Sequence, residues 1–133
     1  MKNKSVLGIF AHPDDETFRA GGSLALLAAR GTHVQTLTAT RGEAGSAGTP
    51  ALCTPEELPQ VREGELRCAC QALGLAPPII LNYPDGQLSS IKPNEILSKL
   101  LDVIDRIQPH SIISFGKDGL SGHSDHIVIG QYA

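Results

Sequence analysis

The stretch SVLGIFAHPDDE, residues 5–16, decides the fold. Its first part, Ser5 to Ala11, is a continuous apolar run that stops at His12-Pro13. Such a run is typical of a strand that is buried on both faces, as in the centre of a parallel sheet. A helical pattern follows from Asp15 or Glu16 to Arg30, and the Thr-rich segment 32–40 indicates a second strand. The chain is therefore predicted to begin with a strand–helix–strand unit.

The rest of the chain continues this alternation of helices and strands. Segments 56–73 and 93–107 carry apolar residues at helical spacing, whereas 79–81 and 111–115 indicate short strands. Apolar residues after His126 indicate the first turns of a further helix. Strands joined by helices of this length predict one α/β domain, residues 1–133, with a Rossmann-like, doubly wound, mostly parallel sheet and helices on both faces. Ligands of such sheets bind at the carboxyl ends of the strands.

Two segments between these elements are predicted to be loops. Segment 41–55 is rich in Gly, Ser and Pro, and a loop of this length inside a small domain usually serves function. Segment 82–86, Asn-Tyr-Pro-Asp-Gly, has the residues of a tight turn. The longer loop is expected to border the site.

The composition excludes several classes of partner. The chain has 133 residues, with 11 Lys+Arg against 14 Asp+Glu and a net charge of -3. It contains no basic run, so we expect neither nucleic acid nor an anionic membrane as a partner. No apolar stretch approaches the roughly 18 residues of a membrane span, and the N-terminal run is too short for a signal peptide. A cytoplasmic protein with no integral membrane segment is the expectation.

The three cysteines do not indicate a site. Cys68 and Cys70 form a lone C-x-C without the second half of a zinc motif, and an odd count argues against a disulfide framework. We expect Cys68 and Cys70 to be partly buried in a helix and Cys53 to be a loop thiol. His33 and His110 are expected to be ordinary surface or strand-end residues.

Two clusters of histidine and carboxylate residues lie where the first and fourth predicted strands end. His12, Asp14, Asp15 and Glu16 follow the first strand, and residues 122–126, Gly-His-Ser-Asp-His, follow the fourth. Neighbouring carboxylates repel one another, and a bound cation compensates for this repulsion. Mixed imidazole and carboxylate ligands suit zinc, which in catalytic sites keeps three protein ligands and an open position. The alternative, two solvated charged loops, leaves their shared position at strand ends unexplained.

Other common sites have no support in the sequence. Gly21-Gly22 falls inside a helical pattern, and no G-x-G-x-x-G motif follows the first strand, so a dinucleotide site is not expected. There is no G-x-S-x-G motif to supply the nucleophile of a serine hydrolase.

With these residues in view, the sequence resembles the LmbE-like, or PIG-L, family of zinc-dependent N-acetylglucosaminyl deacetylases. The resemblance rests on AHPDDE at residues 11–16 and GHSDH at residues 122–126. Between them, in the family's order, lie TRGEAG at 40–45, R-x-x-E-L at 62–66 and Tyr-Pro-Asp-Gly at 83–86. The first two motifs are highly specific, and the match covers nearly the whole chain.

The resemblance implies a role for each residue of the two main motifs. His12, Asp15 and His126 would bind zinc, or another divalent ion such as Fe2+, since affinity alone does not select the metal. Asp14 would be the general base and His123 the group that polarises the carbonyl oxygen. The implied reaction is hydrolysis of the acetamide of an N-acetylglucosamine-type sugar or glycoconjugate, with water activated by the metal as nucleophile.

Two residues align with positions that the family uses near the sugar. Arg62 and Asp85 are therefore candidates for substrate binding by charge-assisted hydrogen bonds. A surface ion pair for Arg62 and a turn-forming role for Asp85 remain open. Glu16 is expected either to support the site from behind or to sit in a first helical turn, where the helix dipole favours a carboxylate.

Three further roles stay undecided at this level. Asp125 would orient His123 by a hydrogen bond, or else serve the start of a helix. Arg41 and Glu43 lie at the predicted ligand edge, and Glu43 either faces the ligand or braces its loop.

Two features depart from the family's pattern. Ser124 stands where many relatives carry Pro, which removes no ligand. The chain also ends seven residues after His126, whereas the relatives continue with further strands and helices. We therefore expect a chain that lacks a C-terminal part, with an exposed apolar edge that favours a homo-oligomer. A competing function, a non-catalytic metal- or sugar-binding module, would use the same ligands without needing Asp14 as a base.

Overall fold

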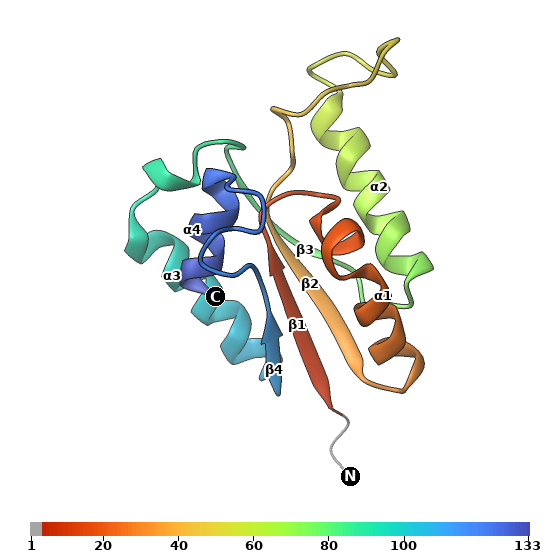
Figure 1. The fold of residues 1–133 in the computed structure, drawn as a ribbon, viewed down its shortest axis with the longest axis vertical. Coiled ribbons are helices and arrows are strands. Elements are labelled where there is room, and N and C mark those ends of the chain that lie inside the picture. Colours follow the sequence, from red (N-terminus) through yellow and green to blue (C-terminus); the bar gives the residue numbers. More distant parts are fainter. Residues whose placement is uncertain (1–3) are drawn as a thin grey trace.

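Strand β1, Ser5–Phe10, lies inside a four-stranded sheet in the computed structural model, which describes residues 4–133 (Figure 1). The other strands are β2 (His33–Thr40), β3 (Ile79–Tyr83) and β4 (Ser111–Ile113). They are arranged in the order β3-β2-β1-β4, and all three pairs are parallel. Every residue of β1 is buried, as its continuous apolar run predicts. The doubly wound sheet is confirmed.

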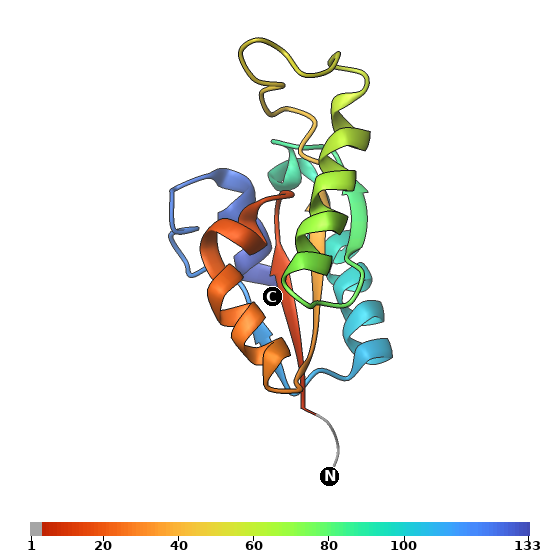
Figure 2. The ribbon, with the colours of Figure 1, turned by 90° about the vertical axis from the view of Figure 1, so that its right-hand side faces the viewer.

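Two helices cover each face of this sheet (Figure 2). Helices α1 (Asp15–Ala29) and α2 (Leu58–Ala72) lie on one face, and α3 (Pro93–Ile107) and α4 (Ser124–Tyr132) lie on the other. The chain winds outward from β1 to β3, and α3 then carries it back to β4 on the opposite side of β1. The winding direction reverses between β1 and β4, which is where sheets of this kind bind ligands.

The core consists mainly of aliphatic side chains that the strands and helices contribute to both faces, with a few aromatic ones such as Phe10. Leu7, Ile9 and Leu37 of the sheet are fully buried. The helical spacing of apolar residues in 93–107 predicts a buried stripe that includes Ile96, Leu100 and Leu101. Ile96 and Leu100 of α3 do pack inward, but Leu101 is 55% exposed, so this part of the prediction is wrong. No helix among residues 4–133 combines the length and the apolar character that crossing a bilayer requires.

The structure shifts several element boundaries near the strand ends. The predicted strand 79–81 extends to Tyr83 in β3, so the turn expected to begin at residue 82 begins at residue 84. The predicted strand 111–115 is shorter in the structure, where β4 ends at Ile113. Helix α4 begins at Ser124, because the His123 imidazole accepts a hydrogen bond from the backbone N–H of Asp125 and caps the helix. His126 therefore lies in the first turn of α4 and does not precede a helix.

The loop between β2 and α2 rises above the carboxyl ends of the strands, as expected for a segment that borders a site (Figures 1 and 2). The cysteines are free, with Cys70 buried and Cys53 half-buried. Cys68 is exposed on α2, so the expectation that it is partly buried is wrong.

Candidate metal centre and active site

The two histidine clusters meet at the carboxyl ends of β1 and β4. His12 follows β1 in the turn that leads into α1, and His126 lies in the first turn of α4. Nδ1 of His12 is 3.2 Å from Nε2 of His126, although the residues are 114 positions apart. The parallel sheet brings them together because both strands end at the same edge.

The three side chains that the resemblance assigns to a metal are in mutual contact. Oδ1 of Asp15 is 3.2 Å from Nε2 of His126, and Oδ2 of Asp15 is 3.6 Å from Nδ1 of His12. All three residues are buried. Two imidazole nitrogens and a carboxylate oxygen therefore converge on one point, which is a donor set that zinc accepts.

Hydrogen bonds to the far side of each imidazole turn the correct nitrogen toward this point. Nδ1 of His126 is 3.1 Å from the carbonyl oxygen of Gly119, and its ring stacks on Phe115 with 4.1 Å between ring centroids. Nε2 of His12 lies 2.9 Å from Oδ1 of Asp85 and 3.1 Å from Oδ2 of Asp125. Metal-binding histidines usually have such a partner on the second nitrogen, so the residues present fit a divalent metal.

Two overlapping groups of side chains hold potential ligand atoms within 4.8 Å of one another: His12, His123 and His126, and His12, Asp85 and Asp125. In the second group the carboxylates already accept backbone hydrogen bonds, from Ala44 to Asp85 and from Gly86 and Leu88 to Asp125. These carboxylates are therefore better suited to orienting His12 than to binding a cation.

Burial and charge change the pKa values of the three convergent residues. Burial lowers the pKa of His12, but the hydrogen bond to Asp15 and the charge of Asp85 outweigh it and leave this pKa raised. Burial raises the pKa of Asp15, but the hydrogen bonds from His12 and the charge of His126 outweigh it and leave this pKa lowered. Burial lowers the pKa of His126 despite the charge of Asp15. The lowered pKa values of Asp15 and His126 favour the ionised carboxylate and the neutral imidazole, which are the metal-binding forms, whereas the raised pKa of His12 favours its protonated form.

Asp125 does not orient His123 through its carboxylate, which corrects that expectation. Its side chain is fully buried, and its carboxylate binds the His12 imidazole and the backbone N–H groups of Gly86 and Leu88. The hydrogen bond that joins Asp125 to His123 comes from the backbone N–H of Asp125, 3.2 Å from Nδ1. The His123 side chain is left exposed beside the convergent residues, 4.7 Å from His12 between ring centroids.

Asp85 and Glu43 connect the two loops that border the site. Oδ2 of Asp85 accepts a hydrogen bond from the backbone N–H of Ala44 at 3.0 Å. The backbone N–H of Asp85 donates to Oε1 of Glu43 at 2.9 Å. Glu43 therefore braces its loop, which is one of its two expected roles, and Asp85 supports His12 as well as facing the pocket.

Asp14 lies at the mouth of the site with its side chain 49% exposed. Its backbone is left-handed, with φ 108 and ψ -28. Partial burial raises the pKa of its carboxyl, and the charge of Arg62 opposes this rise. A titratable group in a cavity whose pKa is shifted by burial and by a charged partner is a candidate for a functional residue.

Arg62 of α2 bonds to protein atoms on three sides. Nη2 lies 2.9 Å from Oδ2 of Asp14 and also donates to the carbonyl of Pro13, and Nη1 donates to the carbonyl of Gly42 at 2.8 Å. The open alternative of an ion pair is therefore observed, although its partner is Asp14 rather than a residue on the helix surface. Arg41, by contrast, pairs with Glu63 at 2.6 Å, and it is absent from the lining of the site cavity.

A cavity of about 350 Å³ joins these residues. Its lining includes all three convergent residues together with Asp14, Arg62, Asp85 and His123. Arg19 and Ser121 also line it and have no motif in the sequence that indicates this. Two further cavities, of about 310 and 370 Å³, also border Asp14 and Arg62, so this ion pair lies where three hollows meet.

A family model described as GlcNAc-PI de-N-acetylase, PIG-L, matches residues 7–133. The chain belongs to the PIG-L family. A 1D-myo-inositol 2-acetamido-2-deoxy-alpha-D-glucopyranoside deacetylase from Rhodococcus erythropolis is 37% identical over 93% of this chain and 49% of its own length. The chain spans about half the length of the curated PIG-L relatives that it matches.

Solved structures show the same fold. The N,N'-diacetylchitobiose deacetylase of Pyrococcus horikoshii superposes with a TM-score of 0.85 and 26% identity, covering 98% of this chain and 48% of that one. The 4-carboxy-2-hydroxymuconate hydratase GalB of Pseudomonas putida superposes with a TM-score of 0.83 and 26% identity, covering 98% and 54%. The fold is thus shared by deacetylases and by a hydratase.

Proposed function

We propose that this PIG-L chain carries the metal site of a deacetylase that hydrolyses the acetamide of an N-acetylglucosamine-type glycoside. The observation that carries the proposal is the convergence of His12, Asp15 and His126 beside Asp14 in one cavity. The relatives named above support the substrate class, since the curated relative and the archaeal structure are both deacetylases of N-acetylated amino sugars. We infer zinc as the metal because the donors are two imidazoles and a carboxylate.

The zinc ion, when bound, would activate water and polarise the acetamide carbonyl. Asp14 accepts the proton of the attacking water and returns it to the nitrogen of the leaving amine. His123, exposed at the cavity wall, donates a hydrogen bond to the oxygen that becomes negative in the tetrahedral intermediate. Asp85 and Asp125 keep His12 turned toward the metal, and Arg62 keeps the Asp14 carboxylate at the cavity.

Acetate release from a panel of N-acetylglucosamine glycosides tests this function. The panel contains the inositol glycoside and diacetylchitobiose. Chelator-stripped protein is measured before and after addition of one equivalent of zinc. Release of acetate that depends on zinc supports the proposal. Bound zinc without release favours a non-catalytic binding module.

A further inference from the structure

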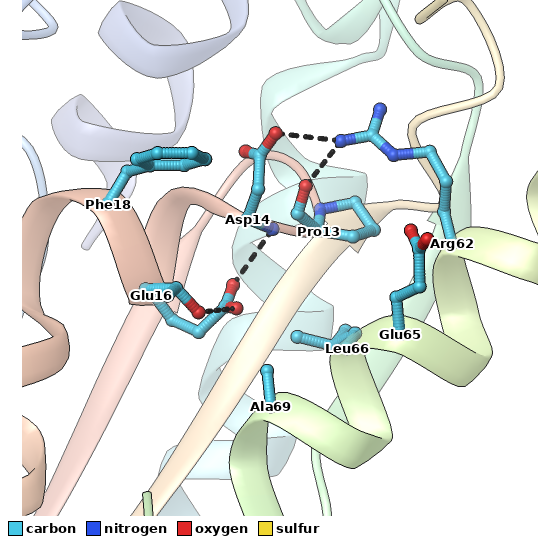
Figure 3. A pocket seen from close by; sticks show the side chains of 9 residues that line it. Pro13, Asp14, Glu16, Phe18, Arg62, Glu65, Leu66 and Ala69 are labelled. Carbon is cyan, nitrogen blue, oxygen red and sulfur yellow. Dashed lines mark hydrogen bonds and ion pairs between the residues drawn. The ribbon is translucent and has the colours of Figure 1, made fainter. Parts of the chain in front are cut away.

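The peptide unit between Pro13 and Asp14 is held from both sides (Figure 3). The Arg62 guanidinium donates to its carbonyl oxygen, on Pro13, and the Glu16 carboxylate accepts a hydrogen bond from its N–H, on Asp14, at 3.1 Å from Oε2. The same guanidinium also binds the Asp14 carboxylate. One arginine and one glutamate thus fix both the backbone and the side chain of the residue that we propose as the base.

The backbone at Asp14 needs such support. Its φ of 108 is a conformation that side chains with a Cβ adopt at a cost of about 1–3 kcal/mol. Residues persist in such conformations only when their surroundings hold them there. Glu16 and Arg62 supply three hydrogen bonds to the Pro13–Asp14 unit, which is enough to offset this cost.

Burial of the Glu16 carboxylate costs free energy, because the side chain loses its contact with water. Glu16 is 1% exposed, and both of its carboxylate oxygens are occupied, Oε2 by the Asp14 N–H and Oε1 by the Thr17 hydroxyl at 2.7 Å. Within residues 4–133 it forms no ion pair that would compensate for its charge. A buried carboxylate without a cation destabilises a fold relative to an apolar residue of similar size. Its position therefore needs a reason other than stability.

The loop after β2 is built so that Arg62 can reach this peptide. A methyl group at Gly45 would lie 2.7 Å from Nη1 of Arg62, and one at Gly42 would overlap the same atom. The absence of side chains at these two positions leaves the space that the guanidinium occupies.

We propose that Glu16 is a positioning residue: it holds the Pro13–Asp14 peptide, together with Arg62, so that the Asp14 carboxylate faces the reacting acetamide. The proposal rests on the proposed function, since it assigns Glu16 a part in placing the catalytic base. Of the two roles expected for Glu16, support of the site and a place in the first helical turn, the proposal favours support of the site. Glu16 contacts neither the metal nor the substrate in this account.

The kinetic test compares Glu16→Gln with Glu16→Leu. Gln keeps an oxygen that accepts the Asp14 N–H, so kcat should stay within about threefold of the wild type. Leu has a similar volume but no acceptor, so kcat should fall by about 100-fold, the cost of a misplacement of about 1 Å, with KM and zinc affinity within about threefold. A merely structural role instead predicts that activity falls only with the folded fraction, so that folded Glu16→Leu protein keeps the kcat of the wild type. Wild-type kcat in Glu16→Leu, or an equal loss in both variants, overturns the proposal.

A second measurement needs no activity and keeps the two proposals separable. Glycine adopts a φ of 108 without strain, so in an Asp14→Gly background the peptide no longer has to be held. Glu16→Leu should therefore change the urea midpoint of unfolding less favourably in the wild-type background than in the Asp14→Gly background, whatever the sign of the change. Equal changes in both backgrounds overturn the proposal that Glu16 holds the Pro13–Asp14 peptide, whether or not the protein releases acetate. Absence of acetate release from the wild type with a confirmed difference in midpoints overturns the proposed function alone.

Discussion

Nε2 of His12 and Oδ2 of Asp125 are 3.1 Å apart, although 113 positions separate the two residues in the chain. This hydrogen bond joins the first histidine motif to the second one. It lies on the side of the His12 imidazole that faces away from the proposed metal. It leaves Nδ1 of His12 facing His126 and Asp15. Asp125 thereby sets which nitrogen of His12 is available to a cation.

Replacing Asp125 by Asn should weaken zinc binding by about 10- to 100-fold. The amide lacks the negative charge that strengthens the hydrogen bond to Nε2 of His12. Whichever way the amide turns, its NH2 group faces a backbone N–H, of Gly86 or of Leu88, so the support behind His12 is displaced. Asp102→Asn on the exposed face of α3 is the matched control and should bind zinc as the wild type does. Competition with a chromophoric chelator measures the affinity. Unchanged affinity in Asp125→Asn would show that the carboxylate does not orient His12.

The site could be predicted in outline from the sequence because its motifs lie at strand ends. Two clusters after two strands of a parallel sheet must meet at one edge, which placed His12, Asp15 and His126 together. The partner of Asp125 could not be predicted in the same way. It depends on where α4 begins, and the continuous apolar run 127–129 has no helical periodicity that marks this start. The left-handed backbone of Asp14 is likewise set by contacts with distant Arg62.

Variants that move Arg62 should lower kcat rather than raise KM. The three hydrogen bonds of its guanidinium end on protein atoms, so its loss displaces Asp14. Gly45→Ala, whose methyl group would lie 2.7 Å from Nη1, and Arg62→Lys should each reduce kcat by about 10- to 100-fold, with KM within about threefold. Steady-state kinetics on the best substrate of the panel measure both constants. A rise in KM with kcat unchanged would instead assign Arg62 to sugar binding.

Three glycines inside helices should respond differently to a methyl group. Gly22 and Gly64 have nothing within 4 Å of an added Cβ, so Ala should stabilise the fold by about 0.5–1 kcal/mol through its higher helix propensity. In α4 a Cβ at Gly130 would lie 2.7 Å from the carbonyl oxygen of Phe115, so Gly130→Ala should destabilise by about 1–3 kcal/mol. Urea unfolding measures all three. Equal effects at Gly64 and Gly130 would contradict the packing of α4 on Phe115.

The cysteines should react with iodoacetamide in the order of their exposure. Cys68 is exposed and should react first, followed by half-buried Cys53. Burial raises the pKa of the Cys70 thiol, so at pH 8 it holds less thiolate, the reactive form, than an unperturbed cysteine. Its modification should speed up as the pH rises toward the raised pKa, and in urea. Mass spectrometry of the digested protein follows each site, and early labelling of Cys70 would contradict its place in the core.

The most direct test of the account compares the wild type with Asp14→Asn for bound zinc and for acetate release. Asp14 is not among the three convergent ligands, so both proteins should hold one equivalent of zinc after dialysis. Removal of the base should lower the rate of acetate release by about 10²- to 10⁴-fold. Acetate release by Asp14→Asn at the wild-type rate, or loss of zinc from this variant, would contradict the assignment of a metal site with a separate catalytic base.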